Sequence, residues 1–290
     1  MKIDHSLDEL KSLHNEAMHF FEAELMLLKE AIPKITDDRI SKAAQLLIRC
    51  GQNGAALFQL ANQLDCFSGT LAILARSFME TIINFCYVCV CDEKEYRAFL
   101  LHPIYKNYHN IALPKIEDDL DFDSIAKNIA IRKERQEKLK VNPIIQEALT
   151  TFSESKSNLN WTKKNLNQRI DVIKKWGKIM DCFFSICKIQ YYSNASEAIH
   201  GTLYGCTYNL GVFDPFFDNT KEDELNKKIY KDNSCILIHL GILIHESLTL
   251  ISYKNDIEDV YSCSYENRTQ ALNLFYYILG NMPKLPDKSN

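Results

Sequence analysis

Four polar side chains interrupt an apolar stretch of the sequence. Within residues 66–91, Arg76 and Glu80 are the only charged residues. A helix turns by about 100° per residue, which places four polar side chains within about 80° of one another: Arg76, Glu80, Asn84 and Tyr87. A charge on an otherwise apolar helix must be paired when it is buried. We therefore expect Arg76 and Glu80 to be substantially buried and to make polar contacts beyond each other.

The polar stripe allows two interpretations. In the first, Arg76 and Glu80 form an internal ion pair, and the other guanidinium donors hold a neighbouring helix. In the second, the helix is a pocket wall in which Arg76 binds an anion and Glu80 orients the guanidinium. Both interpretations stay open at this point.

A second cluster lies in the segment YYSNASEAIHGT. Tyr192, Ser196 and His200 are spaced i, i+4 and i+8, so a helix would bring them to one face. Gly201 follows and would let a backbone or a ligand approach closely. One interpretation is a structural histidine with hydrogen-bonded neighbours. The other is a catalytic histidine, for which the sequence identifies no orienting carboxylate.

Together the two clusters have the chemistry for metal-independent phosphoryl transfer. In this hypothesis Arg76, Glu80 and His200 are catalytic: Arg76 stabilises phosphate charge, Glu80 orients Arg76, and His200 exchanges the proton. Four further residues would bind the substrate, namely Asn84, Tyr87, Tyr192 and Ser196. The hypothesis requires the two clusters to converge on one site.

Helices must position these residues. Glycine and proline number only 9 and 7, and apolar residues recur at helical spacing with no convincing strand-like alternation. The pattern predicts an all-α antiparallel bundle with helices over about 5–31, 37–64, 67–91, 93–109, 124–139, 143–155, 162–173, 174–190, 191–205, 233–253 and 256–279. We expect an N-terminal helix (1–36), one all-α domain (37–279) with a charged, polar helical insertion at about 115–160, and a flexible tail (280–290).

Composition limits the classes of function. The net charge of −4 gives no global attraction to nucleic acid or to anionic membranes. The N-terminal segment is amphipathic rather than a secretory signal, and the apolar run 235–250 contains His239, His245 and Glu246, which disfavour a membrane span. The ten scattered cysteines are expected to be reduced thiols in the cytoplasm.

No cofactor or metal is predicted. Glycine-rich phosphate loops and the HExxH metal motif are missing from the sequence. Cys86, Cys89 and Cys91 come at the end of an apolar helix and are read as packing thiols. Aromatic residues with nearby lysines, around Trp161 and Trp176, favour packing against a partner over stacking on single-stranded nucleic acid.

Three segments, ARSFMETIINFCYV, YRAFLLHPIYKNY and YSNASEAIHGT, resemble a family of bacterial helical proteins known as domain of unknown function five-six-seven-seven. Arg76 and Glu80 match its Arg-x-x-x-Glu helix, and Ser196, His200 and Gly201 match its late Ser-x-x-x-His-Gly. The resemblance covers roughly residues 40–255. It implies a fold similar to HEPN-type proteins, a helical group rich in ribonucleases, toxins and phage-defence effectors, and it supplies no established activity.

HEPN ribonucleases carry an Arg followed after four to six residues by a His, and Arg97 and His102 have this spacing. They are the rival catalytic pair. Ala98 departs from the pattern because the family prefers a polar residue after the arginine. Pro103 also favours a helix boundary directly after His102.

The sequence thus predicts a HEPN-like effector, with a metal-independent ribonuclease or a nucleotide-directed toxin of phage defence as the favoured role. The alternative is a non-enzymatic helical sensor or interaction module, such as the antitoxin-like half of a toxin–antitoxin system, that binds an anionic ligand or a protein. The expected partners are RNA or a nucleotide, and a second copy or another defence protein. No membrane association is expected.

Overall fold

The structure is a computed structural model. It describes residues 3–110, 130, 133–134, 136–153, 160–188, 192, 195–196, 200 and 222–281. Every regular element within these residues is a helix, and none of them lies in a strand. The predicted all-α class is therefore confirmed.

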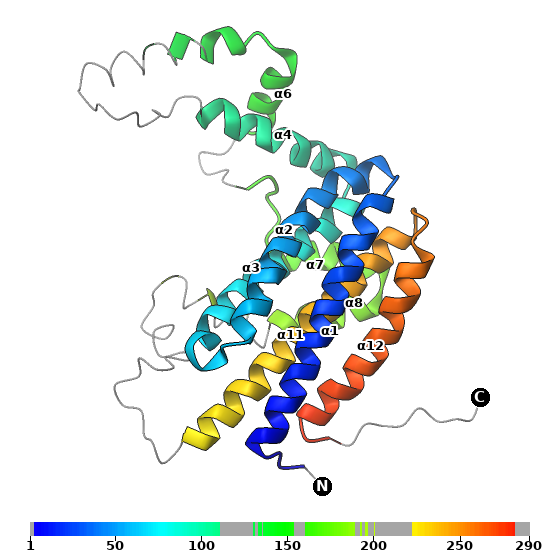
Figure 1. The fold of residues 1–290 in the computed structure, drawn as a ribbon. Coiled ribbons are helices and arrows are strands. Elements are labelled where there is room, and N and C mark those ends of the chain that lie inside the picture. The colour runs from blue at the N-terminus through cyan, green and yellow to red at the C-terminus, as the bar shows by residue number, and fades with distance from the viewer. Residues whose placement is uncertain are drawn as a thin grey trace. The chain divides into compact units, whose positions relative to one another are not determined.

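The helices follow one another as α1 (Leu7–Ala31), the short η1 (Ile32–Lys34), α2 (Asp38–Ala61), α3 (Leu64–Val90), α4 (Glu93–Asn110), α6 (Pro143–Thr151), α7 (Leu166–Ile173), the short η2 (Lys174–Trp176), α8 (Lys178–Cys187), α11 (Glu222–Ser252) and α12 (Glu258–Ile278). Figure 1 shows them in chain order.

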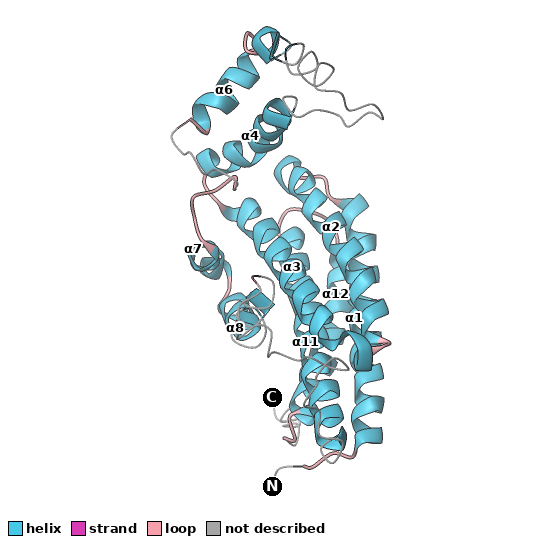
Figure 2. Ribbon diagram, turned by 90° about the vertical axis from the view of Figure 1, so that its left-hand side faces the viewer, coloured by secondary structure: helices cyan, strands magenta, loops and turns pink. Residues whose placement is uncertain are grey.

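The chain divides into two compact units. Unit 1 contains residues 1–90 and 166–290, and unit 2 contains residues 91–165. In unit 1, α11 packs against α1, α3 and α12, while α3 also packs against α2 and α7 (Figure 2). In unit 2, α4 packs against α6 around Leu101, Ala148 and Phe152.

The core of unit 1 follows from the periodicity of its helices. On α1, the buried side chains recur every three or four residues, as in Leu10, Leu13, Ala17 and Phe21. Helix α11 differs because nearly every residue after position 232 is buried. A helix that is covered on all sides forms the centre of a bundle.

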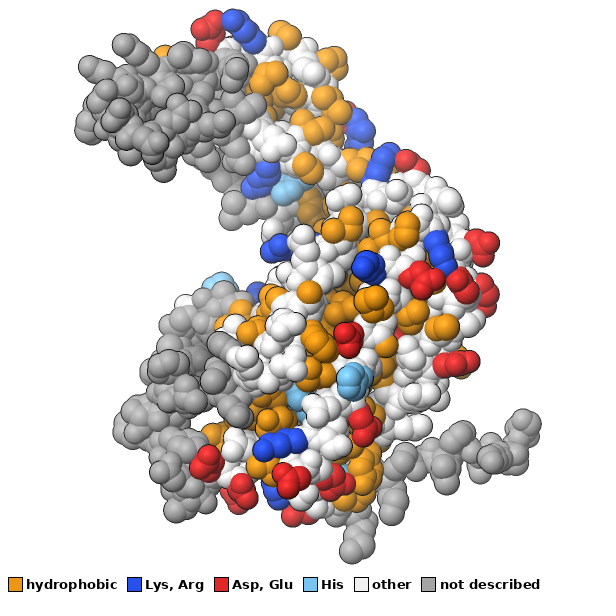
Figure 3. Space-filling model, in the orientation of Figure 1, with side chains coloured by type: hydrophobic (Ala, Val, Ile, Leu, Met, Phe, Trp, Pro, Cys, Tyr) orange, Lys and Arg blue, Asp and Glu red, His pale blue; other side chains and the backbone are white. Residues whose placement is uncertain are grey.

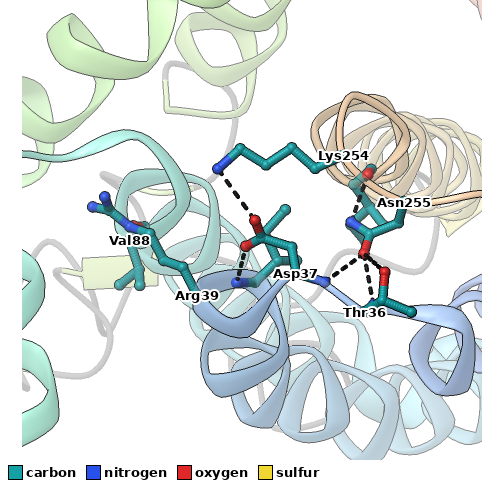
Figure 4. A network of polar contacts seen from close by, with 8 residues as sticks. Thr36, Asp37, Arg39, Val88, Lys254 and Asn255 are labelled. Carbon is teal, nitrogen blue, oxygen red and sulfur yellow. Dashed lines mark hydrogen bonds and ion pairs between the residues drawn. The ribbon is translucent and has the colours of Figure 1, made fainter.

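The connection between α1 and α2 is fixed by polar contacts (Figure 4). Asp37 caps α2, because its carboxylate accepts a hydrogen bond from the backbone N–H of Ile40 at 2.9 Å. Asn255, which follows α11, accepts from the backbone N–H groups of Thr36 at 2.7 Å and Asp37 at 3.0 Å. Lys254 lies 3.3 Å from the Asp37 carboxylate. These contacts join the start of α2 to the end of α11.

Several predicted boundaries are wrong. Helix α4 confirms the helix predicted at 93–109, but it continues through the exposed Pro103, so the boundary favoured after His102 is wrong. The predicted helix 174–190 is interrupted at Gly177, which has an extended backbone with φ of 178°. Helix α11 begins at Glu222 rather than near 233, and its three acidic residues in the first turn suit a helix N-terminus.

Other predictions fall largely outside the described residues. These are the first part of the insertion helix at about 124–139, most of the helix at about 191–205, the loop that follows it, and the tail after residue 281. The predicted domain boundaries therefore stay predictions.

Two helical segments of the described chain are long and apolar enough to cross a membrane, Gly69–Val90 and Glu222–Ser252. In the most apolar window of the second, 94% of the residues are buried inside the protein, against 50% in the first. The central core helix of a bundle is also buried to this extent, so the burial of α11 fits a core helix.

Candidate functional site

Helix α3 carries the predicted polar stripe. Its apolar residues Phe78, Met79, Ile82 and Ile83 are completely buried. Helices α2, α7 and α11 pack around it. Arg76 is mostly buried, since its side chain is 15% exposed, whereas Glu80 is 37% exposed. The burial expected for Arg76 is confirmed, and the burial expected for Glu80 is wrong because this side chain still reaches solvent.

Arg76, Glu80 and Tyr192 form a contiguous cluster. The Tyr192 hydroxyl donates a 2.6 Å hydrogen bond to Oε1 of Glu80. Nη2 of Arg76 lies 3.5 Å from both the Glu80 carboxylate and the Tyr192 hydroxyl. The Tyr192 ring also covers the guanidinium, with Cζ of Arg76 4.6 Å from the ring centroid. The expected polar contacts beyond the Arg76–Glu80 pair are confirmed.

Two donors of Arg76 are left without an acceptor. Its Nε and Nη1 atoms are buried, and neither has a hydrogen-bond partner within the part of the chain that the structure describes. An arginine stays charged and cannot release these protons. A buried donor without an acceptor costs about 1–3 kcal/mol, so anionic oxygens that accept from these two atoms would remove a substantial penalty.

Burial and hydrogen bonding also affect Tyr192. Burial of the phenol raises its pKa, and the hydrogen bond to Glu80 raises it further, while Arg76 opposes the shift. Tyr192 is therefore held in its neutral form, and its hydroxyl donates a hydrogen bond to Glu80. The carboxylate of Glu80 is the acceptor of this pair.

A second arginine, which the sequence analysis missed, lies beside this cluster. Arg169 on α7 donates from Nη1 to Oδ1 of Asn84, the third residue of the stripe. Burial lowers the pKa of the Arg169 guanidinium, and Glu80, Tyr192 and Tyr87 act in the opposite direction. Arg169 thus brings a second guanidinium to the cluster that contains Arg76 and Glu80.

The predicted substrate-binding residues fall into two groups. Asn84 and Tyr192 belong to the cluster through their hydrogen bonds. Tyr87 is completely buried, and its electrostatic effect on Arg169 places it near the cluster. Its role in substrate binding stays a prediction.

Ser196 and His200 share one helical turn, since the backbone N–H of His200 donates to the carbonyl of Ser196 at 3.1 Å. His200 is exposed and Ser196 is partly buried. Among the described residues, no hydrogen bond or ion pair joins His200 to Arg76, Glu80 or Tyr192. The convergence of the histidine with the arginine cluster stays a prediction.

The rival pair lies in unit 2. The Arg97 guanidinium makes a two-point contact with Glu147, at 2.7 Å and 2.5 Å, which raises its pKa. The His102 ring packs against Phe152 with centroids 5.6 Å apart. Arg97 lines a pocket of about 470 Å³ and His102 does not. The carboxylate of Glu147 already occupies the side of Arg97 that a phosphate would use.

A further polar cluster, also missed by the sequence analysis, joins α1, α11 and α12. Glu24 is completely buried and accepts hydrogen bonds from Ser264 at 2.6 Å and from Asn267 at 3.1 Å. Ser264 also lies 2.9 Å from Nδ1 of His245. Burial raises the pKa of the Glu24 carboxyl to about 7 and lowers the pKa of His245 to about 4.

The described part of the chain contains no group of three or more His, Cys, Asp or Glu side chains that could hold a metal ion. Cys86 is completely buried and burial raises its pKa far above the usual range, so its thiol stays protonated.

Trp161 packs edge-on against Phe99 in unit 2, and Trp176 in unit 1 is half exposed near Tyr253.

Residues 42–217 match a family described as a family of unknown function, DUF5677. The match contains most of α2, all of α3 and the Arg76 cluster, and α1 lies outside it. No curated protein and no solved structure matches the chain.

Proposed function

This chain belongs to the DUF5677 family, and we propose that it is a HEPN-like effector that binds a phosphate-bearing ligand, an RNA or a nucleotide, at Arg76. One observation carries the proposal: the buried Nε and Nη1 donors of Arg76 lack an acceptor among the described residues. Nε and Nη1 lie on different sides of the guanidinium, and each is a charged donor of the kind that binds a phosphate oxygen.

The surroundings of Arg76 support an anion over other ligands. Arg169 adds a second positive charge beside Glu80, and the low-dielectric surroundings strengthen attraction to a negative group. The ligand approaches from the side of Glu80, which is partly exposed, and displaces the Tyr192 ring from the guanidinium. The protein would act in the bacterial cytoplasm as part of phage defence.

Cleavage of RNA is the second candidate, and the partly exposed Glu80 carboxylate beside Arg76 favours it. A carboxylate beside a bound phosphate could accept the proton of the ribose 2′-hydroxyl as this oxygen attacks the phosphorus. Arg76 would stabilise the charge on the phosphorane, and His200 would protonate the leaving 5′-oxygen. The mechanism needs no metal ion.

Binding is tested by thermal denaturation of the full chain with inorganic pyrophosphate, adenosine triphosphate or a short single-stranded RNA. A ligand present at about 100 times its dissociation constant should stabilise the protein by about 2.7 kcal/mol. Arg76→Met should remove this stabilisation. Arg49→Met, which changes an exposed arginine on α2, is the matched control.

Two results would contradict the binding proposal: no stabilisation by any of the three ligands, or equal stabilisation of the wild type and Arg76→Met. If Arg97→Met alone abolishes binding, the rival pair is the site. Cleavage is tested separately with labelled RNA in EDTA. Loss of cleavage in His200→Ala with retained binding would support the ribonuclease mechanism, and intact RNA with the wild type would leave a binding protein.

A further inference from the structure

Helices α1 and α2 form an apolar groove on the surface of unit 1. Its volume is about 690 Å³, and its walls include Leu25, Met26, Ile48 and Phe58. Met26 is 58% exposed and Ile48 is 43% exposed, so two large apolar side chains of the groove reach solvent. Figure 3, in which α1 and α2 face the viewer, shows hydrophobic side chains exposed along these helices. A patch of this kind marks an interaction surface.

Small residues give the groove room for a helix. Gly51 and Ala55 lie one turn apart on α2, and both line the groove. A Cβ atom added at Gly51 would meet no other atom within 4 Å, whereas one added at Gly54 would come within 2.4 Å of Leu25. Gly54 therefore serves the packing of α2 against α1, and Gly51 faces open space. The small residues therefore leave room for a side chain from outside to approach α2 closely.

The charges at the groove are self-complementary. Glu22 and Lys29 are the charged residues that line it, and both lie on α1. Their spacing of seven residues puts them on one face, two turns apart, with Leu25 and Met26 midway. When two copies of a helix pack antiparallel about a two-fold axis at this midpoint, each Glu22 faces the Lys29 of the other copy.

We propose that the protein forms a two-fold symmetric homodimer through this groove. Helix α1 of each copy lies antiparallel to α1 of the other, and each Met26 enters the partner's groove above Gly51 and Ala55. This interface is isologous because the same surface serves both copies. A uniformly acidic or basic partner would meet one like charge at the groove, whereas a second copy pairs both charges.

The inference does not depend on ligand binding at Arg76. It assigns a role to α1, which lies outside the family match, together with α2, which begins just before that match and extends into it. The experiments on the two proposals are separate, because one measures mass and the other measures ligand-induced stabilisation.

The test is sedimentation velocity of the full chain between about 1 and about 100 μM, a range that detects dissociation constants typical of weak and moderate homodimers. The wild type should sediment as a dimer at the upper end. Met26→Glu should raise the dissociation constant at least about tenfold, because it places a charge against the same charge of the second copy. Glu266→Lys, an exposed charge change on α12, should leave the dimer intact.

Charge reversal provides the decisive comparison. Glu22→Lys and Lys29→Glu should each weaken the dimer, and the double variant should restore it to near the wild-type dissociation constant. Because both side chains are exposed, the single variants should fold, which circular dichroism checks. A wild type that is monomeric throughout, single variants with unchanged association, or a double variant without recovery would each overturn the proposal.

Discussion

Two polar clusters lie among the packed helices of unit 1, and they differ in how completely their hydrogen bonds are satisfied. Both carboxylate oxygens of Glu24 accept hydrogen bonds from α12, and Ser264 links this carboxylate to His245. At the other cluster, Arg76 contacts Glu80 and Tyr192 through Nη2 alone, and its Nε and Nη1 atoms lack acceptors among the described residues.

The difference separates a structural network from a site prepared for a ligand. The carboxylate oxygens of Glu24 accept hydrogen bonds from its own chain, so no ligand is needed to satisfy them. Arg76 keeps a fixed charge and buried donors that nothing in the described chain satisfies. Retaining such a group costs stability, and proteins retain stability costs of this kind mainly at functional sites. The following four predictions test this distinction.

The largest effect is expected for Glu24→Ala. The substitution removes the acceptor of Ser264 and Asn267 and leaves a cavity between three helices, so the free energy of unfolding should fall by about 3 kcal/mol. Urea denaturation measures this value. Glu16→Ala, at an exposed position of α1, is the control and should change stability by less than about 0.5 kcal/mol. Equal midpoints for the two variants would show that the Glu24 network does not support the fold.

The second prediction concerns pH. Burial raises the pKa of Glu24 from its ordinary value of 4.5 to about 7, so the folded state holds its proton more tightly. The contribution of Glu24 is therefore fully present below pH 4.5 and is lost as pH rises toward 7. Between pH 5 and pH 8 the wild type should lose about 2–3 kcal/mol through this group.

Glu24→Gln isolates this loss because glutamine resembles the protonated carboxyl and does not titrate. The variant should match the wild type at pH 5 and exceed its free energy of unfolding at pH 8. His245 contributes in the opposite direction. Burial lowers its pKa from the ordinary value of 6.5 to about 4, so its contribution to stability falls as pH drops through that interval. Comparing the two proteins at each pH cancels the histidine. Identical pH profiles would contradict the raised pKa of Glu24.

The sequence predicted the Arg76 cluster in part because the two charges were alone on an apolar helix. That signal depends only on spacing along one helix, which a single sequence contains. Arg169 was missed since it lies in the polar segment LNQRIDVI, where one more charge is unremarkable. Its contact with Asn84 joins residues 85 positions apart, and helical periodicity does not report which helices pack together.

Glu24 could have been found. It lies three residues after Phe21 and four before Leu28, both completely or almost completely buried, so it occupies the apolar stripe of α1. A charge at such a position predicts a partner on another helix, although not its identity. By contrast, the groove between α1 and α2 could not be predicted, because an apolar residue such as Met26 has the same periodicity whether it is covered or exposed.

The third prediction returns to Arg76 and has the opposite sign to the first. Arg76→Met keeps much of the side-chain length and removes the buried donors, so the unliganded protein should become about 1–2 kcal/mol more stable. Glu80 remains bonded to Tyr192 and partly exposed, which limits any penalty from its lost partner. Arg49→Met should have no effect. A loss of more than about 1 kcal/mol in Arg76→Met would mean that the arginine is structural after all.

The smallest effect is expected for His239 on α11, which tests whether every unsatisfied buried group indicates a ligand. Both ring nitrogens of His239 are buried and lack partners among the described residues, and the ring packs against Phe275. Burial lowers its pKa to about 4, so the ring is neutral and carries only one donor. A neutral ring costs less to bury than a guanidinium, and no ligand is needed to explain its unsatisfied nitrogens.

His239→Leu should therefore raise the free energy of unfolding by about 1 kcal/mol at pH 8, less than Arg76→Met. At pH 5 the gain should be larger, because the unfolded wild type binds a proton there that the folded state does not. Urea denaturation at both pH values checks the result, and ligand-induced stabilisation should be unchanged. If His239→Leu also removed the response to phosphate, unsatisfied donors in this bundle would act together, and the separation of the Arg76 site from the structural core would fail.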